Sequence, residues 1–141
     1  MYVGVHVRRT DYEHYLKGRS GSKSSYVNKS FFDRAMQEFR TRLKRDGEVV
    51  FIVVSDDLEW VVKNLGNRHN IHIGSRKSGK SGKSGKTEDG LHGAARDFAL
   101  LTLCNHTLLT YGTFGQWAAL LAGGNTILPR GYEQKTTKEL R

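Results

Sequence analysis

The feature that most constrains the fold of this chain is an unbroken apolar run from Val49 to Val54, made only of β-branched residues and one phenylalanine. Such a run has no polar side that could face water. It is typical of a central strand that is covered on both faces, as in parallel sheets. Parallel strands are joined by crossovers that are usually helices, so we expect strands and helices to alternate along the chain.

The rest of the sequence follows this alternation. Strands are expected at residues 2–7, 49–54, 71–73, 107–111 and 126–128, and helices near residues 30–45, 57–65, 93–104 and 114–122. The S-x-x-D pattern at Ser30 and Asp33 predicts the start of the first helix. The predicted fold class is α/β, with a Rossmann-like parallel sheet. For a chain of 141 residues we expect one domain over residues 1–128 and a polar tail over residues 129–141.

A basic, low-complexity segment interrupts this pattern at residues 75–90. More than half of the net charge of +9 comes from five of its side chains, those of Arg76, Lys77, Lys80, Lys83 and Lys86. This charge leaves open a basic adaptor for nucleic acid or heparan-type polyanions, although no aromatic residue is interleaved for base stacking. Gly74 to Ser81 also fits the phosphate-loop pattern G-x-x-x-x-G-K-S, but the repeat of glycine, serine and lysine that follows has no apolar face for the required helix. We therefore expect a flexible basic insertion.

A charged cluster follows the first strand. His6, Arg8, Arg9 and Asp11 lie where that strand ends, and ligands of parallel α/β sheets bind beyond the carboxyl ends of the strands. Arginine suits a pyrophosphate, because its planar guanidinium can donate two parallel hydrogen bonds to phosphate oxygens. The cluster therefore predicts a phosphate-binding site.

A second candidate anion site follows the strand at residues 107–111. This strand runs into a small-residue turn, Gly112 to Gln116, and then into an apolar helix. Glycines let a phosphate approach the backbone, and Thr113 can cap the helix or bind a phosphate oxygen. Two such sites at neighbouring strand ends suggest a diphosphate. On the preceding helix, Asp97 could accept hydrogen bonds from N1 and N2 of guanine, or could be an acid at the N-terminus of the helix.

Two blocks of sequence match a known family. Residues 6–12 read H-V-R-R-T-D-Y, and residues 97–107 read D-F-A-L-L-T-L-C-N-H-T. Together with residues 112–119 and 123–127, they resemble the animal α-1,2-fucosyltransferases of glycosyltransferase family 11. The resemblance implies the donor-binding half of a GT-B enzyme, a GDP-fucose donor, inversion at the fucose anomeric carbon, and a terminal β-galactoside acceptor on a glycoprotein or glycolipid. It also implies a type II Golgi membrane protein with its catalytic part on the lumenal side, whose anchor, stem and acceptor-side domain are expected to lie outside this chain.

The resemblance also implies roles for the candidate residues. Arg8 and Arg9 are expected to neutralise and orient the diphosphate, with a structural ion pair between one of them and Asp11 as the alternative. His6 is expected to frame the nucleotide, unless it is a satisfied core residue at the end of a strand. Asp97 is expected to recognise guanine.

Further residues complete the expected chemistry. Thr113, Phe114 and Gly115 are expected to bind phosphate through a hydroxyl and backbone amides. Asp11 and His14 are the candidates for the general base that deprotonates the galactose hydroxyl. Fixed guanidiniums and helix-end amides would stabilise the charge that builds on the β-phosphate, so neither a metal nor a cofactor is expected.

Two further features are interpreted as structural. The Asp56-Asp57 pair reads as an exposed acidic turn that caps the helix at residues 57–65, and Cys104 reads as a buried thiol inside an apolar run. The predicted function is α-1,2-fucosyl transfer, with this chain as a fragment of the enzyme. The alternatives are a non-catalytic module that binds GDP or a nucleotide sugar, and the polyanion-binding adaptor that would act through residues 76–86.

Overall fold

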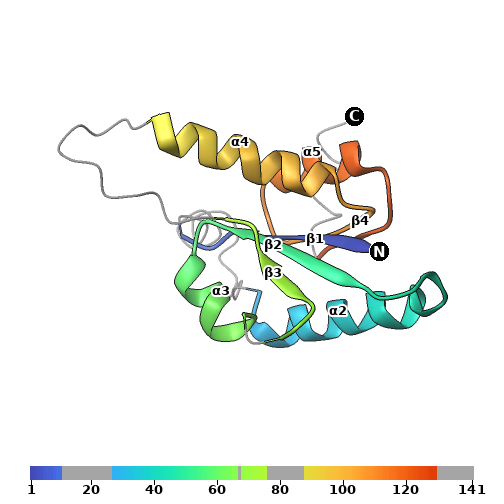
Figure 1. The fold of residues 1–141 in the computed structure, drawn as a ribbon. Coiled ribbons are helices and arrows are strands. Elements are labelled where there is room, and N and C mark those ends of the chain that lie inside the picture. Colours follow the sequence, from blue (N-terminus) through green and yellow to red (C-terminus); the bar gives the residue numbers. More distant parts are fainter. Residues whose placement is uncertain (11–26, 67, 76–87, 130–141) are drawn as a thin grey trace, which may run out of the picture.

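The strands that the structure describes form one parallel sheet in the order β3-β2-β1-β4-β5 (Figure 1). The computed structural model describes residues 1–10, 27–66, 68–75 and 88–129. The strands are β1 (Tyr2–Val7), β2 (Val50–Ser55), β3 (Ile71–Ile73), β4 (His106–Leu109) and β5 (Thr126–Ile127). This order is that of Rossmann-type sheets, so the predicted α/β class is confirmed.

Helices cover both faces of this sheet. α2 (Lys29–Arg42) and α3 (Leu58–Asn64) lie on one face, while α4 (Glu88–Thr102) and α5 (Thr113–Ala122) lie on the other (Figure 1). A short 3-10 helix, η1 (Lys44–Asp46), follows α2. None of the helices within the described ranges is long and apolar enough to span a membrane.

The hydrophobic core is divided between the two faces of the sheet. The larger cluster joins alternate side chains of β1 and β2 to α2 and includes Val3, Val5, Val7, Phe51, Val53, Phe32, Met36 and Phe39. On the other face, Val54 packs with Leu101 of α4 and Ala118 of α5. Val53 and Val54 are neighbours in β2 and are buried on opposite faces. This confirms the interpretation of the apolar run as a central strand.

The start of α2 differs from the prediction. The helix begins at Lys29, and the side chain of Asn28 accepts a hydrogen bond from the backbone N–H of Phe31 at 3.2 Å. The Ser30 hydroxyl lies within the first turn and donates to the Asn28 side-chain oxygen at 2.7 Å. The prediction that Ser30 marks the helix start was therefore wrong, because Asn28, an equally good capping residue, has the extended backbone of the N-cap position.

The start of α4 was also predicted incorrectly. The helix begins at Glu88 rather than near residue 93, so residues 88–90 of the expected insertion are helical. The glycines of this first part have low helix propensity, which favoured a loop in the sequence. The rest of the insertion, residues 76–87, lies outside the described residues, as do Asp11, His14 and residues 130–141 of the tail.

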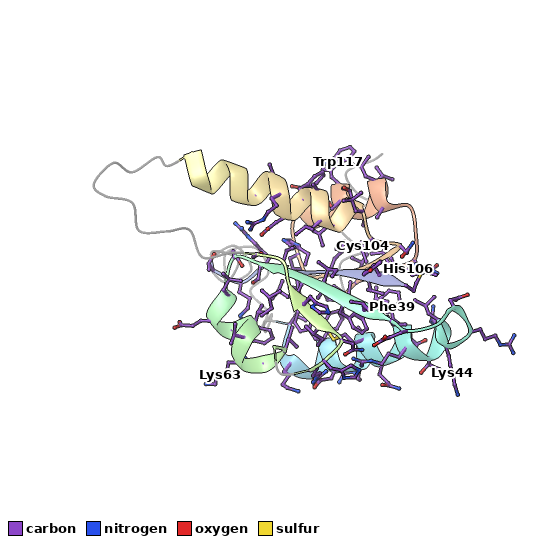
Figure 2. All side chains as sticks on the ribbon, viewed as in Figure 1. Phe39, Lys44, Lys63, Cys104, His106 and Trp117 are labelled. Atoms are coloured by element: carbon purple, nitrogen blue, oxygen red, sulfur yellow. The ribbon has the colours of Figure 1, made fainter. Side chains whose placement is uncertain are left out.

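Side chains between and outside these layers differ sharply in exposure. Figure 2 shows Cys104 between α4 and the sheet, where it is 6% exposed, and burial raises the pKa of its thiol to about 11. The prediction of a buried thiol is therefore confirmed. In contrast, Trp117 lies on the side of α5 that faces away from the sheet (Figure 2) and is 60% exposed.

Candidate functional site

The candidate site lies at the carboxyl ends of β1 and β4. The chain leaves β1 toward β2 on one side, whereas β4 lies on the other side, so the strand order reverses between β1 and β4. Ligands of open α/β sheets bind at such a point. Two hydrogen bonds join the strand ends there: the backbone N–H of Arg8 donates to the Thr110 hydroxyl oxygen at 2.8 Å, and that hydroxyl donates to the His6 carbonyl at 3.1 Å.

The two arginines have different surroundings. Arg8 Nη1 lies 3.3 Å from Asp56 Oδ2, and its side chain is 38% exposed. Arg9 Nε donates to Asp57 Oδ2 at 3.3 Å, its guanidinium lies 4.3 Å from the centre of the Trp60 ring, and its side chain is 18% exposed. Arg9 is thus packed into the protein, whereas Arg8 is the more accessible to a ligand. Arg9 pairs with Asp57, whereas the ion pair expected with Asp11 stays a prediction because Asp11 lies outside the described residues.

Asp56 fixes the segment that carries these arginines. Its carboxylate accepts hydrogen bonds from the backbone N–H groups of Arg9 at 2.9 Å and Thr10 at 3.1 Å, and from the Thr10 hydroxyl at 2.6 Å. Asp56 is exposed as a residue, as expected for the predicted turn, but its side chain is only 18% exposed because it is bound to this segment. Asp57 does cap α3, as predicted, by accepting from the backbone N–H of Trp60 at 3.0 Å.

His6 lies beneath the start of α5. It is 6% exposed, its ring centroid lies 5.2 Å from that of Phe114, and a Cβ at Gly115 would lie 2.7 Å from its Nδ1. Burial lowers the pKa of His6 to about 4, and the nearby Asp56, Arg8 and Asp97 make smaller contributions of both signs. Nδ1 has no hydrogen-bond partner in the part of the chain that the structure describes. His6 is therefore buried and neutral, but it is not the satisfied core histidine that the sequence left open.

The turn before α5 forms a helix N-terminus at the same edge. Gly112 is the N-cap with φ of 100°, a conformation that favours glycine, and it has no side chain of its own with which to cap the helix. Thr113 is the first helical residue, so its predicted role as the cap was wrong; it is exposed, and its role toward phosphate stays a prediction. Phe114 packs between His6 and Phe98, with ring centroids 5.2 and 5.3 Å away. The first amides of a helix have no partner within the helix and can bind an anion.

Asp97 completes the group from α4. It lies in the interior of that helix, so the alternative of an acid at the helix N-terminus was wrong. Its side chain is 15% exposed and accepts hydrogen bonds from the Ser75 hydroxyl and, at 3.1 Å, from Arg96 Nη2. Ser75 also accepts from the backbone N–H of Ser55 at 2.9 Å, which places Asp97 at the carboxyl edge of the sheet.

The structure thus brings together His6, Arg8, Asp97 and the start of α5 at one edge, while the roles expected of these residues stay predictions. Sequence reasoning missed the supporting residues Asp56, Thr110 and Ser75. The available signal for Asp56 was its position directly after the strand that neighbours β1, where Val7 pairs with Ser55. Across the described ranges, no group of three or more His, Cys, Asp and Glu side chains is arranged to hold a metal ion.

Similarity to known proteins agrees with this arrangement. The galactoside alpha-(1,2)-fucosyltransferase 1 of Rattus norvegicus is 40% identical over 126 residues, which cover 89% of this chain and 29% of the relative. The galactoside 2-alpha-L-fucosyltransferase SEC1 of Bos taurus is 39% identical over 128 residues, or 89% of this chain and 30% of the relative. The galactoside alpha-(1,2)-fucosyltransferase 2 of Pongo pygmaeus is 38% identical over 132 residues, which cover 93% of this chain and 34% of the relative.

This chain therefore spans about a third of the length of the curated relatives it matches, between 29% and 34%. The family model described as glycosyl transferase family 11 matches residues 1–137, which is nearly the whole chain. The chain belongs to glycosyl transferase family 11.

Proposed function

We propose that this chain is the donor-binding half of a GT-B galactoside α-(1,2)-fucosyltransferase and that it binds GDP-fucose. The observation that carries the proposal is the meeting of Arg8, the N-terminus of α5 and Asp97 at the edge where the strand order reverses. A guanidinium and helix-end amides suit a diphosphate, and a carboxylate suits the N1 and N2 donors of guanine. The names of the relatives supply the fucosyl group and the galactoside acceptor.

In the proposed reaction, the 2-hydroxyl oxygen of a terminal β-galactoside attacks the anomeric carbon of fucose from the face opposite GDP. The new carbon–oxygen bond forms as the bond to the β-phosphate oxygen breaks, and GDP leaves with the electron pair. The hydroxyl proton passes to a base, for which Asp11 and His14 are the candidates; both lie outside the described residues. Inversion follows from this single displacement.

The described residues would act on the leaving group. Negative charge builds on the β-phosphate as the bond breaks, and fixed donors stabilise it because they need no reorganisation during the reaction. Arg8 would supply a guanidinium on a backbone that is fixed to Thr110, and α5 would supply amides and the positive end of its dipole. Buried His6 stays neutral at pH 7, with a pKa of about 4. Because Arg8 and the α5 amides would stabilise the charge on the β-phosphate, the proposal assigns no metal and no cofactor to the reaction.

The proposal includes the acceptor and the location of the whole protein. The acceptor would be a galactoside-terminated glycan on a glycoprotein or glycolipid, and the protein would lie on the lumenal side of the Golgi membrane as a type II membrane protein. These parts rest on family membership. Transfer is tested by incubation of the enzyme with GDP-fucose and a β-galactoside, and analysis of the product for an α-1,2 linkage.

Donor binding is tested directly by calorimetry with GDP, GDP-fucose and ATP. We expect GDP and GDP-fucose to bind in preference to ATP. Arg8→Ala should weaken GDP binding by roughly 10- to 100-fold, because it removes charge-assisted hydrogen bonds. The matched control is Arg42→Ala on α2, which removes the same charge at a side chain that is 62% exposed and should leave GDP binding unchanged.

The guanine contact has its own control. Asp97→Asn should reduce the preference for GDP over ATP, whereas Asp46→Asn, an equal charge change at an exposed position in η1, should not. Equal indifference of the chain to GDP and ATP would refute the proposal. Binding to heparin that falls steeply with salt and ignores Arg8→Ala would instead favour the polyanion-binding adaptor.

A further inference from the structure

The hydroxyl group of Ser75 links Asp97 to the carboxyl ends of the strands. It donates a hydrogen bond to Asp97 Oδ2 and accepts one from the backbone N–H of Ser55 at 2.9 Å. Ser75 is only 9% exposed, and the Asp97 side chain is 15% exposed. Water therefore has little access to replace this hydroxyl if it is removed.

Close packing of α4 against the end of β3 brings the two residues together. A Cβ at Gly74 would lie 2.8 Å from Leu100 Cδ1, so the Leu100 side chain packs directly against the backbone at this glycine. Leu100 is the i+3 neighbour of Asp97 on α4 and lies on the same side of the helix, while Ser75 directly follows Gly74. The contact at Gly74 thus places the Asp97 carboxylate beside Ser75.

Both oxygens of the Asp97 carboxylate are oriented in this way. Oδ1 accepts a hydrogen bond from Arg96 Nη2 at 3.1 Å, and Oδ2 accepts one from Ser75. An ionised carboxylate has about four lone-pair sites, so each oxygen can accept one further hydrogen bond. The N1–H and 2-amino groups of guanine lie side by side and require two oxygens in a fixed plane. The Asp97 carboxylate meets this requirement only while its rotation is restrained.

The same hydrogen bonds continue toward the arginines. The Ser55 hydroxyl donates to the Val7 carbonyl at 2.8 Å and accepts from the backbone N–H of Asp57 at 2.9 Å. Asp57 in turn pairs with Arg9. Through Ser75 and Ser55, hydrogen bonds therefore connect the carboxylate on α4 to the carboxyl ends of β1 and β2.

We infer that Ser75 is a positioning residue that fixes the Asp97 carboxylate for two-point recognition of guanine. The inference rests on the proposed function and goes beyond it, because it makes selectivity for the base depend on a side chain that need not touch the nucleotide. Ser75 acts by restricting the rotation of the carboxylate. Its removal should therefore affect the contact with the 2-amino group more than the contacts with the diphosphate.

The test compares GDP with inosine diphosphate, which lacks the 2-amino group, by calorimetry on the whole chain. In the wild type we expect GDP to bind roughly 10-fold or more tightly than inosine diphosphate, as for one hydrogen bond to a charged group. Ser75→Ala should lower this ratio to within about threefold of unity, as should Asp97→Asn, since the freed carboxylate loses the fixed geometry. Ser75→Thr keeps the hydroxyl and should keep the wild-type ratio.

A purely structural role for Ser75 would give a different result. In that case Ser75→Ala would weaken both nucleotides equally and keep the wild-type ratio, which would overturn the inference while leaving the proposed donor site intact. A wild-type chain that binds GDP no better than inosine diphosphate would overturn the guanine contact itself and the inference with it. Because Ser75→Ala leaves the Ser55 N–H without its partner, Ser75→Cys provides a second variant of similar size with a poor donor. It should lose the ratio as the alanine variant does, and retention of the ratio would count against the inference.

Discussion

Replacement of Gly115 by alanine tests whether His6 fills the space beneath the start of α5. The added Cβ would lie 2.7 Å from His6 Nδ1 and 3.3 Å from Leu109 Cδ2. Both neighbours are buried, at 6% and 2% exposure, so neither side chain can move into solvent. We expect the methyl group to displace His6 or the first turn of α5, and overpacking of this kind costs about 1–3 kcal/mol.

A second glycine separates this cost from the intrinsic effect of alanine. Gly93 lies in α4, and a Cβ there would meet no atom within 4 Å. Gly93→Ala should therefore stabilise the protein by about 0.5–1 kcal/mol through helix propensity alone. Gly115→Ala gains at most the same amount, so the unfolding free energies of the two variants should differ by at least about 1–3 kcal/mol.

Urea unfolding followed by far-UV circular dichroism measures this difference, provided that both variants keep the wild-type m value. A double-mutant cycle identifies the cause, because the cost of Gly115→Ala should shrink in a His6→Ala background. If Gly115→Ala stabilises the chain as much as Gly93→Ala does, or if its cost is unchanged without the imidazole, the inferred placement of His6 is wrong.

Three further predictions concern stability and reactivity. Burial lowers the pKa of His6 from 6.5 to about 4, so the unfolded chain binds more protons than the folded chain between these pH values. The unfolding free energy should therefore fall by about 2 kcal/mol from pH 7 to pH 5. Urea unfolding measures this loss, which should be smaller in His6→Gln. The Cys104 thiol, with a pKa raised to about 11, should react with a disulfide reagent at pH 8 only as fast as the protein opens. If the thiol of the folded protein reacted as fast as that of the urea-unfolded protein, its burial would be contradicted. Asn28→Ala should cost about 1 kcal/mol of unfolding free energy and Ser30→Ala much less; the reverse order would restore Ser30 as the helix cap.

The class of the fold could be predicted from the sequence because periodicity and composition act locally. The run from Val49 to Val54 lacks a polar side, and the structure buries Val53 and Val54 on opposite faces of the sheet. Helix starts were harder to predict, since they depend on competition between nearby side chains. Asn28 and Ser30 are both good caps, and only the backbone geometry decides that Asn28 takes the role.

The partners of the site residues could not be predicted, because they depend on which strands are neighbours. The sequence offers Asp11 as the nearest acid to the arginines, yet the described carboxylates around them come from Asp56 and Asp57, which are separated from Arg9 by 47 and 48 positions. The parallel register that pairs Val7 with Ser55 brings these segments together. A local pattern does not contain that register.

This neighbourhood also makes two adjacent arginines different, although the sequence treats them alike. Arg9 lies against the Trp60 ring and Asp57 with 18% of its side chain exposed, whereas 38% of Arg8 is exposed beside Asp56. We therefore expect Arg9→Ala to lower the unfolding free energy by about 1 kcal/mol through the lost cation–π contact, with a smaller effect on GDP affinity than Arg8→Ala. Arg8→Ala should do the opposite, because its loss of charge falls on the ligand. Urea unfolding and GDP calorimetry on both variants decide the matter: equal losses of GDP affinity with unchanged stability would mean that both guanidiniums face the diphosphate. Such a result would mean that Arg9 packs on Trp60 only in the ligand-free protein and leaves it when the diphosphate binds.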